Sequence, residues 1–64
     1  MAGALYRELV RRLHDAGCVF VRQGKGSHEI SLSPATQRHV VVPFDIKKIG
    51  TVNAILRQAG LPKL

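Results

Sequence analysis

Apolar residues recur at helical spacing in two stretches of the chain. In residues 4–16 they form one stripe, made up of Leu5, Tyr6, Leu9, Val10, Leu13 and Ala16. In the second stretch, which Thr51 is expected to cap, they are Val52, Ile55, Leu56 and Ala59. Gly17 and Gly60 are suitable stops for these two stretches. The pattern therefore predicts one helix near each end of the chain.

Between these stretches the periodicity is that of β-strands. A glycine-flanked turn at residues 24–26 and a proline-led loop at residues 34–38 separate three runs of alternating or valine-rich sequence. The three runs are residues 18–23, 27–33 and 39–43. The order predicts an α+β fold, α-β-β-β-α, with one domain over residues 1–64 and a three-stranded antiparallel sheet.

The short connections also predict how the strands pair. The expected opposed pairs are Arg22 with His28, Ser33 with His39, and His28 with Phe44. Directly opposed residues share a face of a sheet, so one face collects most of the apolar side chains. That face should pack under both helices, and it carries Phe20, Ile30, Leu32, Val40, Val42 and Phe44. The other face should be wetter, and it carries Val19, Glu29, Ser31 and Val41.

The charge balance narrows the choice of partner. The 64 residues include 10 Lys and Arg against 4 Asp and Glu, which gives a net charge of +6 and a pI of about 10.5. Such a balance favours polyanions, namely nucleic acid, an anionic membrane surface or an acidic protein. No apolar run approaches the roughly 20 residues that span a bilayer. The first residues also lack the layout of a signal peptide, so no membrane partner is expected.

Cysteine usage and motifs exclude several kinds of site. Cys18 is the only cysteine, so no intrachain disulfide can form, and the reducing cytoplasm is the expected compartment. Cys18 lies in an apolar run and is expected to be a small buried hydrophobe. No His/Cys spacing matches a zinc site, and no P-loop, nucleophile elbow or dinucleotide fingerprint occurs. We therefore expect neither a metal nor a cofactor.

The predicted register gathers polar and ionisable side chains at one end of the sheet. They are Arg22, Lys25, Ser27, His28 and Asp45, with Lys47 and Lys48 close behind. Histidine gives or takes a proton near neutral pH. Cations suit a phosphate, as do the four backbone amides of residues 24–27, the segment that holds Gly24 and Gly26. RNA cleavage by internal attack needs both kinds of group. This end is therefore the candidate site, with His28 as acid or base and Asp45 able to orient its ring.

The same residues also have plainer explanations. His28 lies two residues before Ile30 and four before Leu32, so it shares their face of the strand. It could therefore be a core histidine whose ring is hydrogen-bonded to internal partners. Lys25 could serve only the solubility of the turn, and Asp45 could cap a turn. His39 is expected at the far end of its strand, roughly 17 Å from His28 at the rise of a β-strand, so the two should not form an acid–base pair.

Several segments of the chain together resemble one family. They are Gly17 with Phe20, then residues 22–28, 40–43, 50–52 and 55–61. The ordered set closely resembles the HicA (YcfA-like) mRNA-interferase toxins of toxin–antitoxin modules, from about residue 5 to residue 62. The resemblance implies a double-stranded-RNA-binding-domain-like fold with both helices on one face of the sheet, and cleavage of mRNA that halts translation. It also implies a HicB antitoxin that covers the active site, no metal, and a catalytic histidine at His28, after the Gly-Ser pair.

The sequence departs from this family pattern in two places. Many members carry a second histidine two residues after the strand-ending proline, where this chain has Asp45. Residues 29–33 are also less basic and less aromatic than usual, so we expect recognition of RNA by backbone and shape, with low sequence specificity. Two alternatives to a toxic nuclease stay open. One is a non-catalytic RNA-binding module or degenerate toxin of the same fold, and the other is an interaction protein whose basic face docks an acidic partner.

Overall fold

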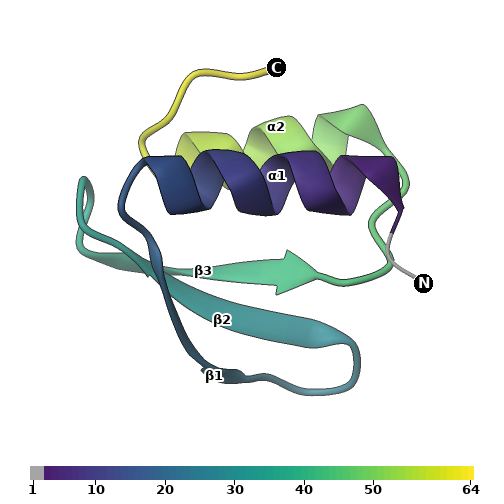
Figure 1. The fold of residues 1–64 in the computed structure, drawn as a ribbon, viewed down its shortest axis with the longest axis horizontal. Coiled ribbons are helices and arrows are strands. Elements are labelled where there is room, and N and C mark those ends of the chain that lie inside the picture. Colours follow the sequence, from purple (N-terminus) through teal and green to yellow (C-terminus); the bar gives the residue numbers. More distant parts are fainter. Residues whose placement is uncertain (1–2) are drawn as a thin grey trace.

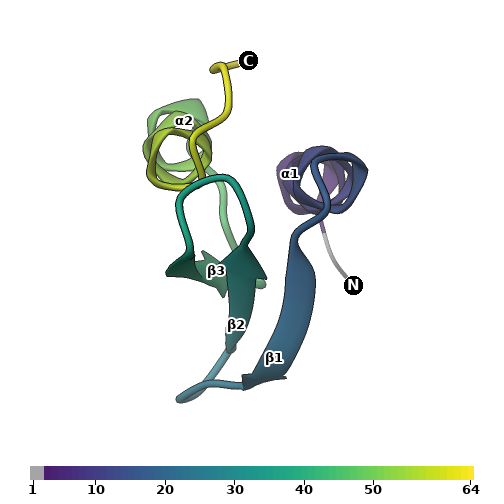
Figure 2. The same ribbon diagram turned by 90° about the vertical axis from the view of Figure 1, so that its left-hand side faces the viewer.

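The computed structural model describes residues 3–64, which form two helices and three strands. The order is α1 (Ala4–Asp15), β1 (Val19–Gln23), β2 (His28–Ser33), β3 (Arg38–Pro43) and α2 (Ile49–Gln58). The strands form one antiparallel sheet in the order β1-β2-β3, and both helices lie on the same side of it (Figure 1 and Figure 2). The predicted α-β-β-β-α fold is confirmed, and it is consistent with a double-stranded-RNA-binding-domain-like fold. Neither helix of the described residues is long and apolar enough to cross a membrane.

The core lies between the two helices and the sheet. Both predicted helical stripes contribute to it, together with the inward-facing valines of β3. The large side chains that are fully buried are Leu9, Leu56, Val40, Val42, Val52 and Ser33. Full burial of a Leu or Val side chain stabilises a protein by about 1.5–3 kcal/mol, so these few positions hold the two layers together. Cys18 is buried in the same cluster, as predicted.

The structure confirms the predicted C-terminal end of α2 but not its predicted N-terminal cap. Lys48, in an extended conformation, is the N-cap, and its carbonyl accepts the amides of Thr51 and Val52 at 3.1 and 3.2 Å. Thr51 therefore lies inside the first turn, and the prediction that it caps the helix is wrong. Gly60 follows the helix at φ +79°, a left-handed conformation that glycine adopts without strain, so the predicted stop is confirmed.

β2 and β3 pair one residue away from the predicted register. His28 lies opposite Pro43 rather than Phe44, and Ser33 lies opposite Arg38 rather than His39. The cause is the connection between the strands, residues 34–37, which is one residue shorter than the predicted loop. A one-residue shift in register moves every side chain of a strand to the other face relative to its partner.

A bulge at Val21 changes the pairing of β1 with β2. Arg22 lies opposite Ile30 rather than the predicted His28, whereas beyond the bulge Phe20 lies opposite Ser31. The bulge therefore puts Phe20 and Arg22 on opposite faces of the sheet, although regular alternation places residues two apart on the same face.

The new registers invert the predicted faces of β2. Glu29, Ser31 and Ser33 face the helices, so the prediction that Ile30 and Leu32 do so is wrong. Two of these polar side chains, Glu29 and Ser33, have hydrogen-bond partners on the helix side of the sheet. The Tyr6 hydroxyl donates to Glu29 Oε1 at 2.5 Å, and the Ser33 hydroxyl donates to the Ala59 carbonyl at 2.8 Å. The positions that do lie on the helix side as predicted are Phe20, Val40, Val42 and Phe44.

No element of the described chain covers the opposite side of the sheet, which we call the open face. Its residues are Val19, Arg22, His28, Ile30, Leu32, His39, Val41 and Pro43. The two histidines lie at opposite ends of this face, because His28 pairs with Pro43 and His39 pairs with Leu32. The predicted separation of His28 from His39 is therefore confirmed.

Candidate functional site

The turn between β1 and β2, residues 24–27, fixes the backbone of His28. The Gly24 amide donates to the His28 carbonyl at 2.8 Å, and the His28 amide donates to the Lys25 carbonyl at 3.2 Å. The side-chain amide of Gln23 adds a hydrogen bond to the same His28 carbonyl at 3.1 Å. Gly26 has φ +61°, a conformation that side-chain-bearing residues rarely adopt, so the tight turn depends on glycine there.

Gly24 is also in close contact with His28. A Cβ atom at Gly24 would lie 3.2 Å from the His28 carbonyl oxygen and 3.4 Å from the His28 Cβ. The same atom would lie 3.2 Å from Cδ1 of Ile30. A side chain at this position would therefore require its neighbours, the backbone of His28 among them, to shift by a few tenths of an ångström.

The His28 side chain is exposed on the open face, at the end of the sheet nearest the turn. The explanation of His28 as a core histidine is therefore wrong, because the actual register turns this side of β2 away from the helices. Within residues 3–64 the ring takes part in no hydrogen bond or ion pair. Both of its nitrogens are thus available to a bound molecule.

Ser27 and Asp45 join the turn to the end of β3. The Phe44 amide donates to the Ser27 carbonyl at 2.8 Å, and the Ser27 hydroxyl donates to Asp45 Oδ1 at 3.4 Å. Asp45 is thus brought to the candidate site as predicted, but its hydrogen-bond partner is Ser27 rather than the His28 ring.

Within residues 3–64 the cations at this end of the sheet are exposed and have no ion-pair partner. They are Arg22 at the end of β1, Lys25 in the turn, and Lys47 and Lys48 in the connection to α2. The Arg22 guanidinium has only a 3.5 Å contact with the Gln23 carbonyl. All ion pairs within residues 3–64 lie on α1, where Glu8 and Asp15 are the acidic partners. The positive charge of this end is therefore available to an anion.

Backbone amides in the turn are free as well. In residues 3–64 the amides of Lys25, Gly26 and Ser27 donate to no backbone acceptor, whereas the Gly24 amide is taken by His28. Three successive unpaired amides beside cationic side chains form a surface that suits a phosphate oxygen. The predicted anion site of the turn is thereby narrowed from four amides to three.

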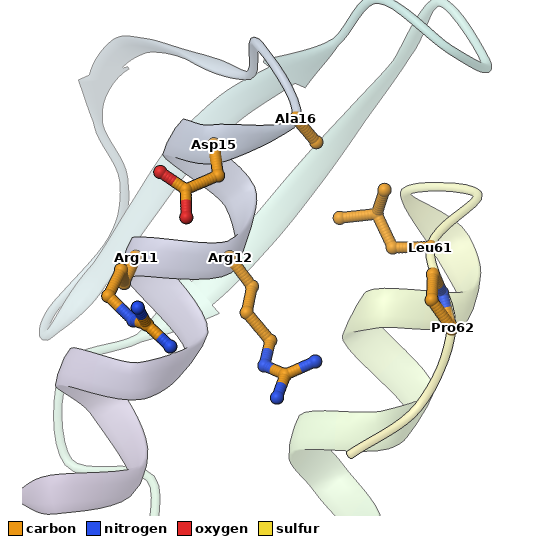
Figure 3. Close-up of a pocket in the computed structure, with 6 residues that line it drawn as sticks. All are labelled: Arg11, Arg12, Asp15, Ala16, Leu61 and Pro62. Carbon is orange, nitrogen blue, oxygen red and sulfur yellow. The ribbon is translucent and has the colours of Figure 1, made fainter.

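A separate cleft of about 430 Å³ lies between the end of α1 and the segment after α2 (Figure 3). Arg11 and Arg12 line it, but both guanidinium groups bind Glu8, at 3.1 and 2.9 Å, and the bonds from Arg12 and Arg11 lower the pKa of that carboxyl. Because these cations are already paired, the cleft suits a phosphate less well than the turn. Residues 3–64 contain no cluster of three or more His, Cys, Asp or Glu side chains that could hold a metal ion.

Comparison with known families decides which group this geometry belongs to. The family described as "HicA toxin of bacterial toxin-antitoxin" matches residues 6–61 of the 64-residue chain. The chain belongs to the HicA toxin family. No curated protein and no solved structure matched it. HicA family membership gives the chain a toxin role in a toxin–antitoxin module, and therefore an antitoxin as its partner.

Two contacts beside the candidate site of this HicA-family toxin were not predicted from the sequence. Tyr6 of α1 binds Glu29, and its ring packs against Phe44 with the centroids 4.9 Å apart. Burial, then the hydrogen bond to Glu29 and the negative charge of Glu29, together raise the pKa of Tyr6 from 10.0 to about 12. Through these contacts α1 packs against the sheet beside His28. Only the true register could have revealed them, because alternation assigned Glu29 to the wetter face.

Proposed function

We propose that this HicA-family toxin is a metal-independent endoribonuclease that cuts mRNA and so blocks translation, acting as a single domain without a cofactor. His28 is the general acid or base. The observation that supports this most strongly is the exposed His28 ring, held by its backbone beside the unpaired cations and free amides of the 24–27 turn. A proton-transfer group next to a phosphate-binding surface is what RNA cleavage requires.

The reaction is an internal transesterification. The ribose 2′-hydroxyl attacks the adjacent phosphorus and loses its proton to a base, while the bond from phosphorus to the 5′-oxygen breaks and that oxygen takes a proton from an acid. The products carry a 2′,3′-cyclic phosphate and a 5′-hydroxyl. Neutral His28 can take the first proton or protonated His28 can give the second, and either role contributes about 10²–10⁴-fold. Since His39 lies at the other end of the open face, the remaining proton is exchanged with water.

The cations and amides of the turn stabilise the phosphate during this step. Negative charge accumulates on the non-bridging oxygens as the phosphorus becomes five-coordinate. Arg22 and Lys25 can lie against these oxygens, together with the amides of residues 25–27 and the Ser27 hydroxyl. The backbone amides are fixed by the turn, so they act with little reorganisation, which is why such electrostatic stabilisation is effective.

The rest of the surface favours binding of RNA through its backbone. Lys47 and Lys48 extend the positive charge from the end of β3 towards α2, where further phosphates can bind. The chain has only one Tyr, two Phe and no Trp, so few bases can stack on aromatic side chains. We therefore expect low sequence specificity. The antitoxin is of the HicB type, and an acidic partner complements a chain with a net charge of +6.

The direct test is cleavage of a long unstructured RNA by the purified chain, with and without EDTA, followed by analysis of the new ends. Cleavage that EDTA does not reduce, with 2′,3′-cyclic phosphate and 5′-hydroxyl ends, is the expected result. Loss of cleavage in EDTA, or ends with a 3′-hydroxyl, would contradict the proposed mechanism. RNA binding without cleavage by the folded protein would identify a non-catalytic module.

A further inference from the structure

β1 is exposed along its whole length, although three of its five residues are apolar. It is an edge strand, because it pairs only with β2. All five of its residues are exposed, and three successive large apolar side chains are among them. The exposed fractions are 55% for Val19, 61% for Phe20 and 43% for Val21. Exposed apolar surface of this kind marks sites of interaction with other proteins.

A cavity of about 250 Å³ opens beside β1, between this strand and α1. We call it the α1/β1 groove. Its apolar lining consists of Tyr6, Val10, Leu13, Cys18, Phe20 and Val42. Figure 2 shows the arrangement behind it, with α1 lying over β1 while α2 lies over β3. Pockets for small ligands usually measure about 300–1,000 Å³, so this groove suits one large apolar side chain better than a small molecule.

The bulge at Val21 decides how a partner could use this edge. A bulge interrupts the regular row of amides and carbonyls and twists the edge, which hinders continuous pairing with another strand. The shift in register occurs between Phe20 and Arg22, in the middle of the five-residue strand. A partner would therefore bind through side chains in the groove rather than by adding a strand to the sheet.

Charge identifies the kind of partner. The chain carries a net charge of +6, so a second copy approaching this edge would meet like charge. An acidic partner would be attracted instead. Membership of the HicA toxin family supplies one protein partner, the antitoxin.

We propose that the α1/β1 groove is a docking surface for the antitoxin, in which an acidic segment inserts a large apolar side chain between Val10 and Phe20. The proposal rests on the family membership and not on nuclease activity. A segment seated there lies along the strand that carries Arg22 and leads into the 24–27 turn. Binding in the groove would thus place acidic residues next to the cations that hold RNA, and exclude the nucleic acid.

The test compares two matched valines and one phenylalanine. Val10 in the groove is 37% exposed and Val41 on the open face is 43% exposed, so a glutamate at either site meets similar solvation. Val10→Glu, Phe20→Glu and the control Val41→Glu are made in a His28→Ala background, which removes any dependence on cleavage. The probe is the protein encoded by the reading frame adjacent to the toxin gene, and calorimetry measures its affinity.

We expect Val10→Glu and Phe20→Glu each to weaken binding by about 30-fold or more, the loss typical of a central interface residue, and Val41→Glu to bind as the parent does. Circular dichroism checks that each variant is folded. Hydrogen exchange on the complex of the parent chain needs no variant in the groove, and it should show protection of α1 and β1. Unchanged affinity of both groove variants, a loss confined to Val41→Glu, equal losses in all three, or no binding by the parent would each overturn the proposal.

Discussion

His28 is held through its backbone while its side chain stays free. Gly24 and Gln23 both donate to its carbonyl, and its amide donates to Lys25. Fixing the main chain in this way orients the Cα–Cβ bond without using either ring nitrogen. A residue that must exchange protons with a substrate benefits from such an arrangement, because no internal partner competes for them.

Asp45 is a carboxylate close to His28 that does not bind the His28 ring. Its contact is with the Ser27 hydroxyl at 3.4 Å. In Asp45→Asn the side-chain oxygen can still accept this hydrogen bond, while one negative charge leaves the end of the sheet that we propose binds RNA. We therefore expect tighter RNA binding and an undiminished rate of cleavage, measured by filter binding and single-turnover assays. A tenfold or larger fall in the rate, with the protein folded, would show instead that the carboxylate acts on His28.

The sequence was sufficient to locate the residues of the candidate site. It was not sufficient to show on which face of the sheet the His28 side chain lies. Alternation and the glycine-flanked turn placed His28 at the start of β2, with Arg22 and Lys25 nearby, and the structure agrees. Whether His28 faced the core or the solvent depended on the register. The register depended on loop lengths that sequence patterns determine only to within a residue, and one residue exchanges the two faces.

Among the elements, β2 departs most from the simple pattern. Its serines and Glu29 face the helices, while Ile30 and Leu32 lie on the open face. Simple alternation failed because it assigns polar residues to solvent, whereas Glu29 and Ser33 have internal partners on α1 and at the end of α2. The helices were easier to predict, since a wide apolar stripe does not depend on pairing with a distant segment.

Ser33→Ala tests the polar contact that joins β2 to α2. The Ser33 hydroxyl is buried and donates to the Ala59 carbonyl at 2.8 Å, so its removal leaves a buried acceptor without a donor. We expect the free energy of unfolding to fall by about 1–3 kcal/mol, measured by urea denaturation. Ser27→Ala, at an exposed position, is the control and should change stability by much less. Equal stability of Ser33→Ala and the parent would show that this contact contributes nothing.

Tyr6 reports on the contact between α1 and β2, and it is the only tyrosine of the chain. Because burial and Glu29 raise its pKa from 10.0 to about 12, the folded state favours the neutral phenol. This contribution to stability is complete below the unfolded pKa and is lost as the pH rises through the folded pKa. Tyrosinate absorbance should therefore titrate near 12 in the folded protein, and about two units lower in urea. The same midpoint in both states would rule out a buried, hydrogen-bonded Tyr6.

At the scale of the whole molecule, positively charged side chains lie on both layers. The acidic side chains that pair with them in residues 3–64 lie only on α1. On α1, Glu8 pairs with Arg11 and Arg12, whereas the cations around the 24–27 turn have no acidic partner in residues 3–64. The net charge alone could predict a polyanionic partner. It could not show which cations are paired within residues 3–64, because that depends on which side chains lie close enough to neutralise one another.

Salt dependence tests whether RNA binds the cations of the 24–27 turn in preference to cations elsewhere on the surface. Arg22→Ala and Lys25→Ala should each make the plot of log affinity for single-stranded RNA against log salt shallower, by about 0.7 for each lost phosphate contact. Arg57→Ala is the control, because Arg57 is exposed at the end of α2, beside the loop that lies at the other end of the sheet. A slope that changes equally in all three variants would mean that RNA binds the molecule without preference for the turn.

The most direct test of the account compares two histidines on the same open face. His28→Ala should reduce the single-turnover rate of RNA cleavage by about 10²–10⁴-fold while RNA binding and the fold persist. His39→Ala, at the opposite end of that face, should cleave as the parent does. Cleavage by folded His28→Ala at the rate of the parent would contradict the assignment of His28 as the acid or base.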